Sequence, residues 1–383
     1  MKRYYLDCNA TTPLRSEVRA AMAPYLEGLL GNASSLHAEG RRARAAVDDA
    51  RDRVAAWLGA QPHEIVFTGG GTESNNLGVQ GLALAAAAKS GRRHVVTSAG
   101  EHHAVLQAAE ALRDRHGFEV TFLPLDAAGR TEAGAVAEAL RDDTVLVSVM
   151  TANNETGVRQ PVPEIARLCA ERGVLFHTDA VQSAGKERLE PAARGVSALS
   201  LTAHKFGGPV GAGVLYLKSG LPVARLMEGG EHENQRRPGT ENVAGIVGLA
   251  EAVVRSREDD TALHESQRAW TERLWDGLQA LGGVRRNGSA RERLPNTLNV
   301  SFEGVDGEEL LIGLDLEGLA VSSGSACLVG SVQRSHVLRA MGLGEDEIAA
   351  TVRFSIGEGL EPEDADEVLA RVERVVRRLR GAA

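Results

Sequence analysis

Three short segments of this 383-residue chain carry groups suited to binding one small ligand. The first is residues 69–75 (GGGTESN), which follow an apolar run and open an expected helix. Free backbone N–H groups at a helix N-terminus, with the Thr72 hydroxyl beside them, favour a phosphate. Neither common nucleotide-binding motif fits. GxGxxG would need a glycine where Ser74 stands, and the phosphate-binding motif GK[ST] fails because the only Gly-Lys pair in the sequence is followed by Glu187. An ordinary glycine-rich turn stays open.

The other two segments each place a charged side chain at the end of an apolar strand. Asp179 follows residues 174–178 and could hold a cationic nitrogen, or simply cap the next helix. Lys205 follows residues 198–201, and partial desolvation would make its amine a nucleophile suited to a Schiff base; a solvated surface lysine is the alternative. A phosphate cradle, a carboxylate and an amine in this order match the phosphate, ring nitrogen and aldehyde of pyridoxal phosphate.

Arg353 could bind a substrate carboxylate. It lies in an expected strand at residues 351–356, where apolar and polar residues alternate, so its side chain points away from the apolar face. A guanidinium there could take a carboxylate in two parallel hydrogen bonds. A solvated arginine on the polar face is the alternative.

The three cysteines differ in setting. Cys327 ends the small, polar run SSGSA, which favours a mobile loop and a reactive thiol. Cys169 stands at helical spacing from Ile165 and is expected to be a buried small hydrophobe, and Cys8 has no evident catalytic setting. An odd number of widely spaced cysteines predicts no disulfide framework and favours a reducing compartment, the cytoplasm.

The elements that must position these residues alternate between strands and helices. Strand patterns cover residues 64–68, 94–98, 119–123, 144–150, 174–178, 198–201 and 213–217, and helical patterns cover 72–90, 103–116, 132–140 and 163–172. Because the strand runs are nearly continuously apolar, both faces of the sheet should be covered. We therefore expect an α/β fold, with a mostly parallel sheet flanked by helices.

The C-terminal part predicts a second, smaller α+β domain. Strand patterns cover 296–302, 319–322 and 351–356, helical patterns cover 307–314, 332–340 and 362–379, and an amphipathic stretch at 256–281 links the two parts. We expect a large cofactor-binding domain at 15–255. Residues 1–14 with 256–383 would form a small domain that carries the Cys327 loop and Arg353.

Charge and hydropathy exclude two classes of partner. With 43 Lys and Arg against 52 Asp and Glu, the net charge is −9, which argues against direct nucleic-acid binding. The longest apolar run, residues 82–88, is too short to span a bilayer, and the first residues lack the core of a signal peptide. We expect no membrane contact.

Ten motifs carry a resemblance along nearly the whole chain: YLDCNATTP at 5–13, GNASSLHAEGRRAR at 31–44, FTGGGTESNN at 67–76, EHHAVL at 101–106, NNETGVRQP at 153–161, HTDAVQSAGK at 177–186, HKFGGPVGAGVLY at 204–216, RPGTEN at 237–242, SSGSAC at 322–327 and RFSIG at 353–357. The sequence resembles the NifS/IscS-type cysteine desulfurases, pyridoxal-phosphate enzymes of the class V aminotransferase family. The resemblance implies the type I fold of pyridoxal-phosphate-dependent transferases.

The resemblance also implies a role for each matching residue. Lys205 would hold the cofactor covalently, Asp179 would pair with its ring nitrogen, and His102 would stack on the ring and help to move protons. The remaining implied cofactor contacts are Asn154 and Gln182 to the ring substituents, and Gly71, Thr72, Thr202 and His204 to the phosphate, with Thr240 reaching in from the second subunit of a homodimer. No metal site is expected, since the adjacent His102 and His103 point apart.

For the reaction, the resemblance implies that L-cysteine is bound by Arg353 with help from Asn32 and Asn154. Lys205 would remove the Cα proton, and the Cys327 thiolate would take the substrate sulfur as a persulfide, leaving L-alanine. The sulfur would pass to an acceptor protein such as an iron–sulfur scaffold, with a cluster bridged through Cys327 as one option. The other expected uses of this sulfur are the thiolation of tRNA and the synthesis of sulfur-containing cofactors.

Several alternatives stay open. Within the family these are a selenocysteine lyase, a cysteine-sulfinate desulfinase and a small-substrate aminotransferase, the last of which has no use for Cys327. Outside it are a non-catalytic binding protein and a nucleotide-binding oxidoreductase.

Three departures from the family pattern limit what the resemblance implies: two concern partner docking, and the third, at Thr202, keeps a hydroxyl that should still bind phosphate. Residues 328–336 read LVGSVQRSH where relatives commonly show Leu-Glu-Pro-Ser-His, Thr202 replaces a common serine, and Ala383 follows the last expected helix too closely for the longer tail of some relatives. The receiving pathway is therefore left open.

Overall fold

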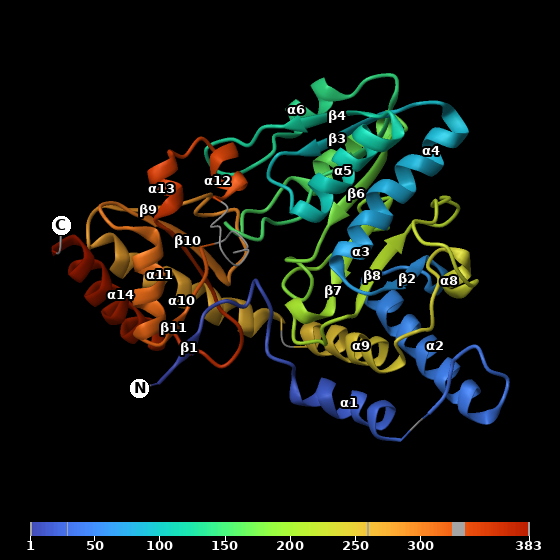
Figure 1. Cartoon of the computed structure of the whole chain (residues 1–383), viewed down its shortest axis with the longest axis horizontal. Helices are drawn as coiled ribbons and strands as arrows, with labels where there is room; N and C mark the ends of the chain where they lie inside the picture. Colours follow the sequence, from blue (N-terminus) through green and yellow to red (C-terminus); the bar gives the residue numbers. More distant parts are fainter. Residues whose placement is uncertain (1, 29, 259, 324–333, 382–383) are drawn as a thin grey trace.

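The computed structural model describes residues 2–28, 30–258, 260–323 and 334–381. Two bodies of different size lie side by side, the larger built from the first two thirds of the chain and the smaller mainly from the last third (Figure 1). In the described residues, no helix is both long and apolar enough to cross a bilayer.

A seven-stranded sheet forms the centre of the larger body. Its order is β2 (Ile65–Thr68), β8 (Gly213–Leu217), β7 (Ala198–Thr202), β6 (Leu175–Asp179), β5 (Thr144–Ser148), β3 (His94–Ser98) and β4 (Glu119–Leu123). Only β8 runs antiparallel to its neighbours, so the predicted mostly parallel sheet is confirmed. Five of its strands, β2, β3, β5, β7 and β8, are buried along their whole length, which explains their apolar runs.

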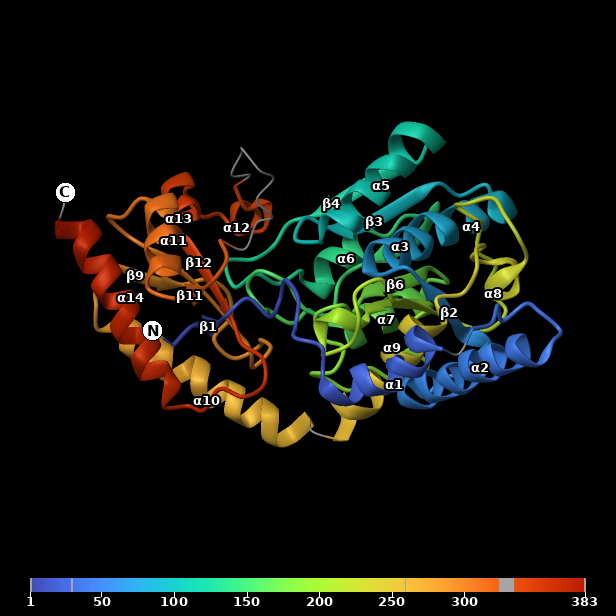
Figure 2. The ribbon, with the colours of Figure 1, turned by 60° about the horizontal axis from the view of Figure 1, so that its bottom comes forward.

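Helices cover both faces of this sheet (Figures 1 and 2). They are α1 (Ser16–Glu27), α2 (Ala38–Leu58), α3 (Gly71–Asn76), the π-helical turn η2 (Leu77–Gly81), α4 (Leu82–Ser90), α5 (His103–His116), α6 (Ala133–Ala139), α7 (Val162–Glu171), the short α8 (His232–Gln235) and α9 (Val243–Glu258). The sequence patterns did not predict α1 and α2, which pack against α9. The buried face of α2 includes small residues such as Ala43, Ala50 and Ala55 within a strongly charged sequence, so its apolar stripe is weak.

The smaller body has its own sheet and core. Strands β12 (Thr351–Ser355), β10 (Thr297–Phe302) and β9 (Val284–Arg286) form an antiparallel sheet, and β1 (Tyr4–Tyr5) pairs in parallel with β11 (Leu319–Ala320). Its helices are α10 (Asp260–Gln279), α11 (Gly307–Leu316), α12 (His336–Ala340), α13 (Glu345–Ala349) and α14 (Asp364–Gly381). Tyr4 and Leu6 share one core cluster with Trp270, Phe302 and Phe354. The domain boundaries themselves stay a prediction.

Residues 6–12 form a crossing segment that links the two bodies, visible as the dark blue trace between β1 and α1 in Figures 1 and 2. The backbone N–H of Leu6 donates to Ala320 O at 2.8 Å and that of Cys8 to Ser355 O at 2.8 Å, both in the smaller body. The N–H of Thr12 donates to His204 O at 2.8 Å, in the larger body. The crossing segment therefore passes directly over the predicted site.

Candidate active site

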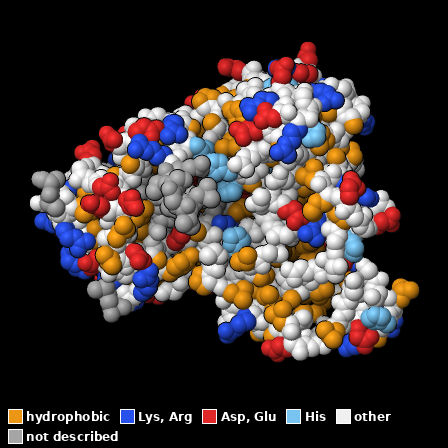
Figure 3. Space-filling model, viewed as in Figure 1, with side chains coloured by type: hydrophobic (Ala, Val, Ile, Leu, Met, Phe, Trp, Pro, Cys, Tyr) orange, Lys and Arg blue, Asp and Glu red, His pale blue; other side chains and the backbone are white. Residues whose placement is uncertain are grey.

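Most of the predicted site residues line one cavity of about 300 Å³ between the two bodies. They are Gly71, Thr72, His102, Asn154, Asp179, Gln182, Thr202, His204, Lys205 and Arg353. Histidine side chains gather beside a hollow at this junction in Figure 3. Asn32 and Thr240 are exposed and do not line the cavity of their own chain. Cys327 lies outside the described residues.

The end of β6 supplies Asp179, which is 5% exposed. Its Oδ2 accepts a hydrogen bond from Asn75 Nδ2 at 2.6 Å, and its Oδ1 accepts one from the Val181 N–H at 2.8 Å. Burial raises the pKa of this carboxyl, while the neighbouring His102 acts in the opposite direction. A cation placed against Asp179 would relieve the cost of burying its charge.

The end of β7 supplies Thr202 and, one turn later, Lys205 in the 3-10 helix η3 (Ala203–Lys205). Lys205 Nζ donates to the carbonyl oxygens of Asn9 at 2.7 Å and Ala10 at 2.8 Å, both in the crossing segment. Burial, with a smaller contribution from Arg353, lowers the pKa of Lys205 to about 8. A substantial fraction of this amine is therefore neutral near physiological pH, as a nucleophile or base requires.

His102 caps the N-terminus of α5 at the side of the cavity. Its Nδ1 accepts from the Ala104 N–H at 3.1 Å, which leaves Nε2 to carry the proton of the neutral ring. The surrounding walls desolvate the imidazole and lower its pKa. His102 is thus a neutral ring with one fixed nitrogen and one available for proton transfer.

The start of α3 lies where the sequence predicts a phosphate cradle. Gly70 has a φ of 149°, and a Cβ on Gly71 would lie 2.9 Å from Val181 Cγ2, so a side chain does not fit at this approach. Burial, followed by the charge of Lys205, lowers the pKa of His204 to about 4. A neutral His204 can donate a hydrogen bond to an anion without adding charge.

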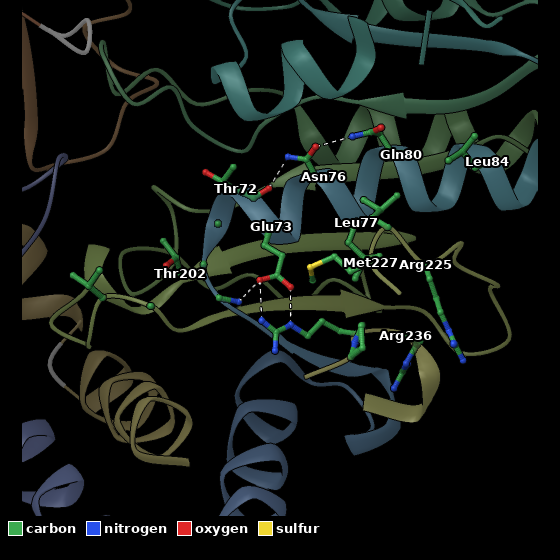
Figure 4. Close-up of a pocket in the computed structure, with 18 of the residues that line it drawn as sticks. Thr72, Glu73, Asn76, Leu77, Gln80, Leu84, Thr202, Arg225, Met227 and Arg236 are labelled. Atoms are coloured by element: carbon green, nitrogen blue, oxygen red, sulfur yellow. Dashed lines mark hydrogen bonds and ion pairs between the residues drawn. The ribbon is translucent and has the colours of Figure 1, made fainter. Parts of the chain in front are cut away.

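A wider groove of about 870 Å³ opens from this cradle toward the surface. Figure 4 shows Thr72 and Thr202 at one end of it and Arg225 and Arg236 at the other. Glu73 points into the groove and pairs with Arg237, whose Nε lies 2.7 Å from Glu73 Oε1. The phosphate end of the site is therefore open at one side within a single chain.

Arg353 is buried, with a side chain that is 5% exposed. Its Nη2 donates to Asp7 Oδ1 at 2.6 Å and its Nη1 to Asn154 O at 3.0 Å, while Nε is buried without a partner in the described residues. The solvated arginine considered above is not what the structure shows. Asn32, by contrast, is exposed, and its Oδ1 accepts from the Ser34 N–H at 2.8 Å in a local turn.

Sequence reasoning missed several residues that contact the site. Asn75 binds Asp179, Asn9 O accepts from both Lys205 and Gln182 Nε2, and Asp7 pairs with Arg353. His336 also lines the cavity, with its ring centroid 4.6 Å from that of His103. Asp7 and Asn9 stand in the motif YLDCNATTP, so the signal was present but no chemistry pointed to it.

Of the cysteines, the structure describes Cys8 and Cys169. Both are buried, Cys169 as expected, and burial raises the pKa of each thiol to about 12. Neither is a thiolate near neutral pH, so neither is a competent nucleophile.

The chain is similar to known proteins along nearly its whole length. Residues 4–368 match the family model "Aminotransferase class-V". The chain is 43% identical over 382 residues to the cysteine desulfurase IscS of Dictyoglomus turgidum, covering 99% of this chain and 96% of that protein. It is 47% identical to the cysteine desulfurase IscS of an Anaeromyxobacter species, covering 98% and 93%. A solved structure titled "NIFS-LIKE PROTEIN" aligns with a TM-score of 0.91 and 34% identity, covering 99% of this chain and all of that one.

Proposed function

The chain belongs to the class V aminotransferase family, and from this we propose that it is a pyridoxal-phosphate-dependent cysteine desulfurase. It converts L-cysteine to L-alanine and holds the released sulfur as a persulfide on Cys327. The observation that carries this proposal is the meeting of Asp179, Lys205 and Arg353 around one cavity. These three side chains supply a partner for a ring cation, an amine and a partner for a carboxylate.

The cavity fits pyridoxal phosphate. Gln182 is 4% exposed and its Oε1 is buried without a partner in the described part of the chain, so a hydrogen-bond donor is missing there. The Gly71 backbone comes so close to Val181 that a side chain does not fit there, as expected where backbone N–H groups approach a ligand. Asp179 is buried, and its hydrogen-bond donors among the described residues, the Asn75 amide and the Val181 N–H, are both uncharged.

Each group of the cofactor then has a protein partner. Lys205 would hold the aldehyde carbon covalently, Asp179 the ring nitrogen, and His102 one face of the ring. The other holding residues would be Asn154 and Gln182 at the ring substituents, and Gly71, Thr72, Thr202, His204 and the partner subunit's Thr240 at the phosphate. When bound, pyridoxal phosphate supplies an electron sink for the pair left at the substrate Cα.

The chain's own residues perform the remaining tasks. Arg353 binds the substrate α-carboxylate through two N–H groups, with Asn154 beside it. The Lys205 amine, with a pKa of about 8, removes the Cα proton and later returns a proton to carbon. His102 Nε2, which its cap hydrogen bond leaves available, donates and accepts protons at the side of the cavity.

Sulfur transfer takes place at Cys327. Its thiolate attacks the substrate sulfur, an S–S bond forms, the Cβ–S bond breaks and the electron pair stays on carbon. Protonation of that carbon gives the methyl group of alanine. The reaction converts cysteine and a thiol into alanine and a persulfide, so it needs no external oxidant.

The test is the variant Cys327→Ser, with Cys169→Ala as a matched control at a buried cysteine. Alanine formation from cysteine should fall below a few percent of wild type for C327S, since the sulfur has no acceptor, while the yellow cofactor stays bound. C169A should retain turnover. Full activity in C327S, or a persulfide label on a different residue, would refute the assignment.

We infer that the persulfide supplies an acceptor protein, such as an iron–sulfur scaffold, in the cytoplasm. The net charge of −9 favours a protein intermediary over direct contact with tRNA or DNA. Isolation of the untagged native enzyme with its bound partners, followed by transfer of labelled sulfur, tests this. Label on a partner cysteine supports it, and label that leaves only as free sulfide contradicts it.

We also infer a homodimer in which Thr240 completes the phosphate site of the partner. Thr240 is exposed and lies away from its own cavity, while the cradle opens into the wide groove of Figure 4. The exposed large apolar residues include Leu14, Leu26, Leu30, Leu36, Val210 and Met227. Such apolar surface is typical of a covered interface.

Mixing two weak variants tests the shared site. In a heterodimer of Lys205→Ala and Thr240→Ala, one site combines an intact Lys205 with an intact Thr240 from the other subunit. The mixture should regain cofactor affinity that T240A alone lacks. Sedimentation as a monomer, or no gain on mixing, would contradict the shared site.

A further inference from the structure

The side chain of Asp7 contacts Arg353 directly. Asp7 Oδ1 accepts from Arg353 Nη2 at 2.6 Å, and the pair is 23% and 5% exposed, respectively. The second contact of the guanidinium is to Asn154 O, from Nη1 at 3.0 Å. Arg353 is therefore held by two segments that lie 346 and 199 residues away in the sequence.

Arg353 keeps enough donors for a second carboxylate. A guanidinium has five N–H donors, and the contacts to Asp7 and Asn154 use two of them. Nη1 and Nη2 each retain one N–H, whereas Nε is buried without a partner among the described residues, and Arg353 lines the cavity. Since a bidentate carboxylate needs two donors, a substrate can bind Arg353 while Asp7 stays in place.

The backbone holds Asp7 in a fixed position relative to Arg353. Ser355, two residues beyond Arg353 on β12, donates its N–H to Leu6 O at 2.8 Å and accepts the Cys8 N–H at 2.8 Å. The Tyr5 hydroxyl donates to Asp7 O at 3.3 Å. The Asp7 carboxylate and the Arg353 guanidinium thus belong to two hydrogen-bonded backbone segments. Their relative position is therefore fixed before any ligand binds.

We propose that Asp7 is a positioning residue for the substrate carboxylate, which fixes the plane of the Arg353 guanidinium so that its unused N–H groups face the cavity. This inference rests on the proposed desulfurase function. Without Asp7 the guanidinium keeps, among the described residues, only its contact to Asn154 O and can turn about its own side-chain bonds. In the opposite role, the Asp7 carboxylate would compete with the substrate carboxylate for Arg353. Removal of Asp7 would then lower KM for L-cysteine instead of raising it.

The experiment uses the full-length, cofactor-loaded enzyme with Asp7→Ala, Asp7→Ser and Asp7→Asn. KM for L-cysteine should rise about tenfold in D7A and D7S, as expected for loss of a charge-assisted hydrogen bond, with kcat within about twofold of wild type. D7N keeps an acceptor oxygen and should recover most of the loss. Asp315→Ala, which removes the exposed ion pair with Arg3 on the same body, is the matched control and should leave KM unchanged.

Calorimetry gives a readout independent of turnover. L-alanine carries the carboxylate and L-alaninamide lacks it, so D7A should weaken L-alanine about tenfold and leave the amide within about twofold. An unchanged or lower KM in D7A and D7S, an equal loss for the amide, or a fall in kcat alone would overturn the role of Asp7. Failure of the proposed function differs: wild type itself then forms no alanine from cysteine, and the inference falls with it.

Discussion

Two clusters in the site are built in different ways. The sheet-edge cluster, Asp179, Thr202 and Lys205, comes from the ends of adjacent strands β6 and β7 within 26 residues of sequence. The carboxylate cluster, Asp7, Asn154 and Arg353, joins three distant segments, two of them 346 residues apart. Sheet topology places the first cluster, whereas the second exists only after the two bodies pack.

Because of this difference, substitutions in the two clusters should have different effects on the kinetics. In the proposed function the sheet-edge cluster would hold the cofactor and serve the bond changes of the reaction, so its loss should act on kcat. The carboxylate cluster would orient a substrate group that does not react, so its loss should act mainly on KM. Of the four predictions below, the first three test that division and the last tests the stability of the sheet, from the largest expected effect to the smallest.

Lys205→Ala should abolish turnover. The variant loses the covalent link to the cofactor and the base at Cα, so kcat should fall by at least about a thousandfold. Steady-state assay of alanine and the visible absorbance of the cofactor measure both losses. Lys186→Ala is a sharp control, because burial also lowers the pKa of Lys186 to about 8, while its Nζ donates to Gln182 O. Equal losses in the two variants would contradict the assignment.

Asp179→Asn should reduce kcat by roughly a hundredfold, because a neutral amide cannot compensate a cationic ring nitrogen in a buried site. The amide keeps the size of the side chain, so the fold should survive. Stopped-flow spectra and kcat measure the effect. If KM rose instead, with kcat unchanged, the sheet-edge cluster would not be separate from substrate binding.

Arg353→Lys should raise KM for cysteine by about tenfold or more while kcat changes less. Lysine keeps the charge but cannot form two parallel hydrogen bonds to a carboxylate. Steady-state kinetics with cysteine measure the split. A variant with normal KM would show that the carboxylate binds elsewhere, and the division between the clusters would fail.

The smallest effect concerns the sheet beneath the cofactor site and appears only in stability. His177 on β6 is fully buried between Ser148 Oγ at 2.8 Å and Ser200 Oγ at 3.0 Å, and burial lowers its pKa to about 3. The folded state thus excludes a proton that His177 binds in the unfolded state. The contribution of His177 to the free energy of unfolding should therefore be fully present above pH 6.5 and be lost as the pH drops toward 3. Urea unfolding of wild type and His177→Gln measures this slope, which should be shallower in the variant. Parallel slopes would show that other groups control acid unfolding.

The two clusters also mark how far the sequence could predict the site. Strand ends, the cradle and the order of Asp179 and Lys205 follow from local patterns, and all seven predicted strands of the large sheet are present. Alternation along β12 indicated that Arg353 faces away from the apolar residues. It could not show that the arginine is buried, because burial depends on Asp7 and on the packing of the smaller body.

Other gaps have physical causes as well. The charged, alanine-rich α2 has a weak apolar stripe, so the hydrophobic periodicity of its sequence did not predict that it packs against α9. Asn32 does not line the cavity of its own chain, so its predicted contact with the substrate stays a prediction. The predicted roles of Thr240 and Cys327 stay predictions for the tests above.

The crossing segment also has a consequence for biosynthesis. Asp7 leaves the ribosome early and must wait for Arg353, 346 residues later, which at ordinary elongation rates takes roughly 20 to 70 s. The nascent chain can complete its large sheet well before that, since β8 ends at Leu217. A stalled or truncated product would therefore carry most of a cofactor pocket without a place for the carboxylate of its amino acid, and the ability to select a substrate would be the last property that the growing chain acquires.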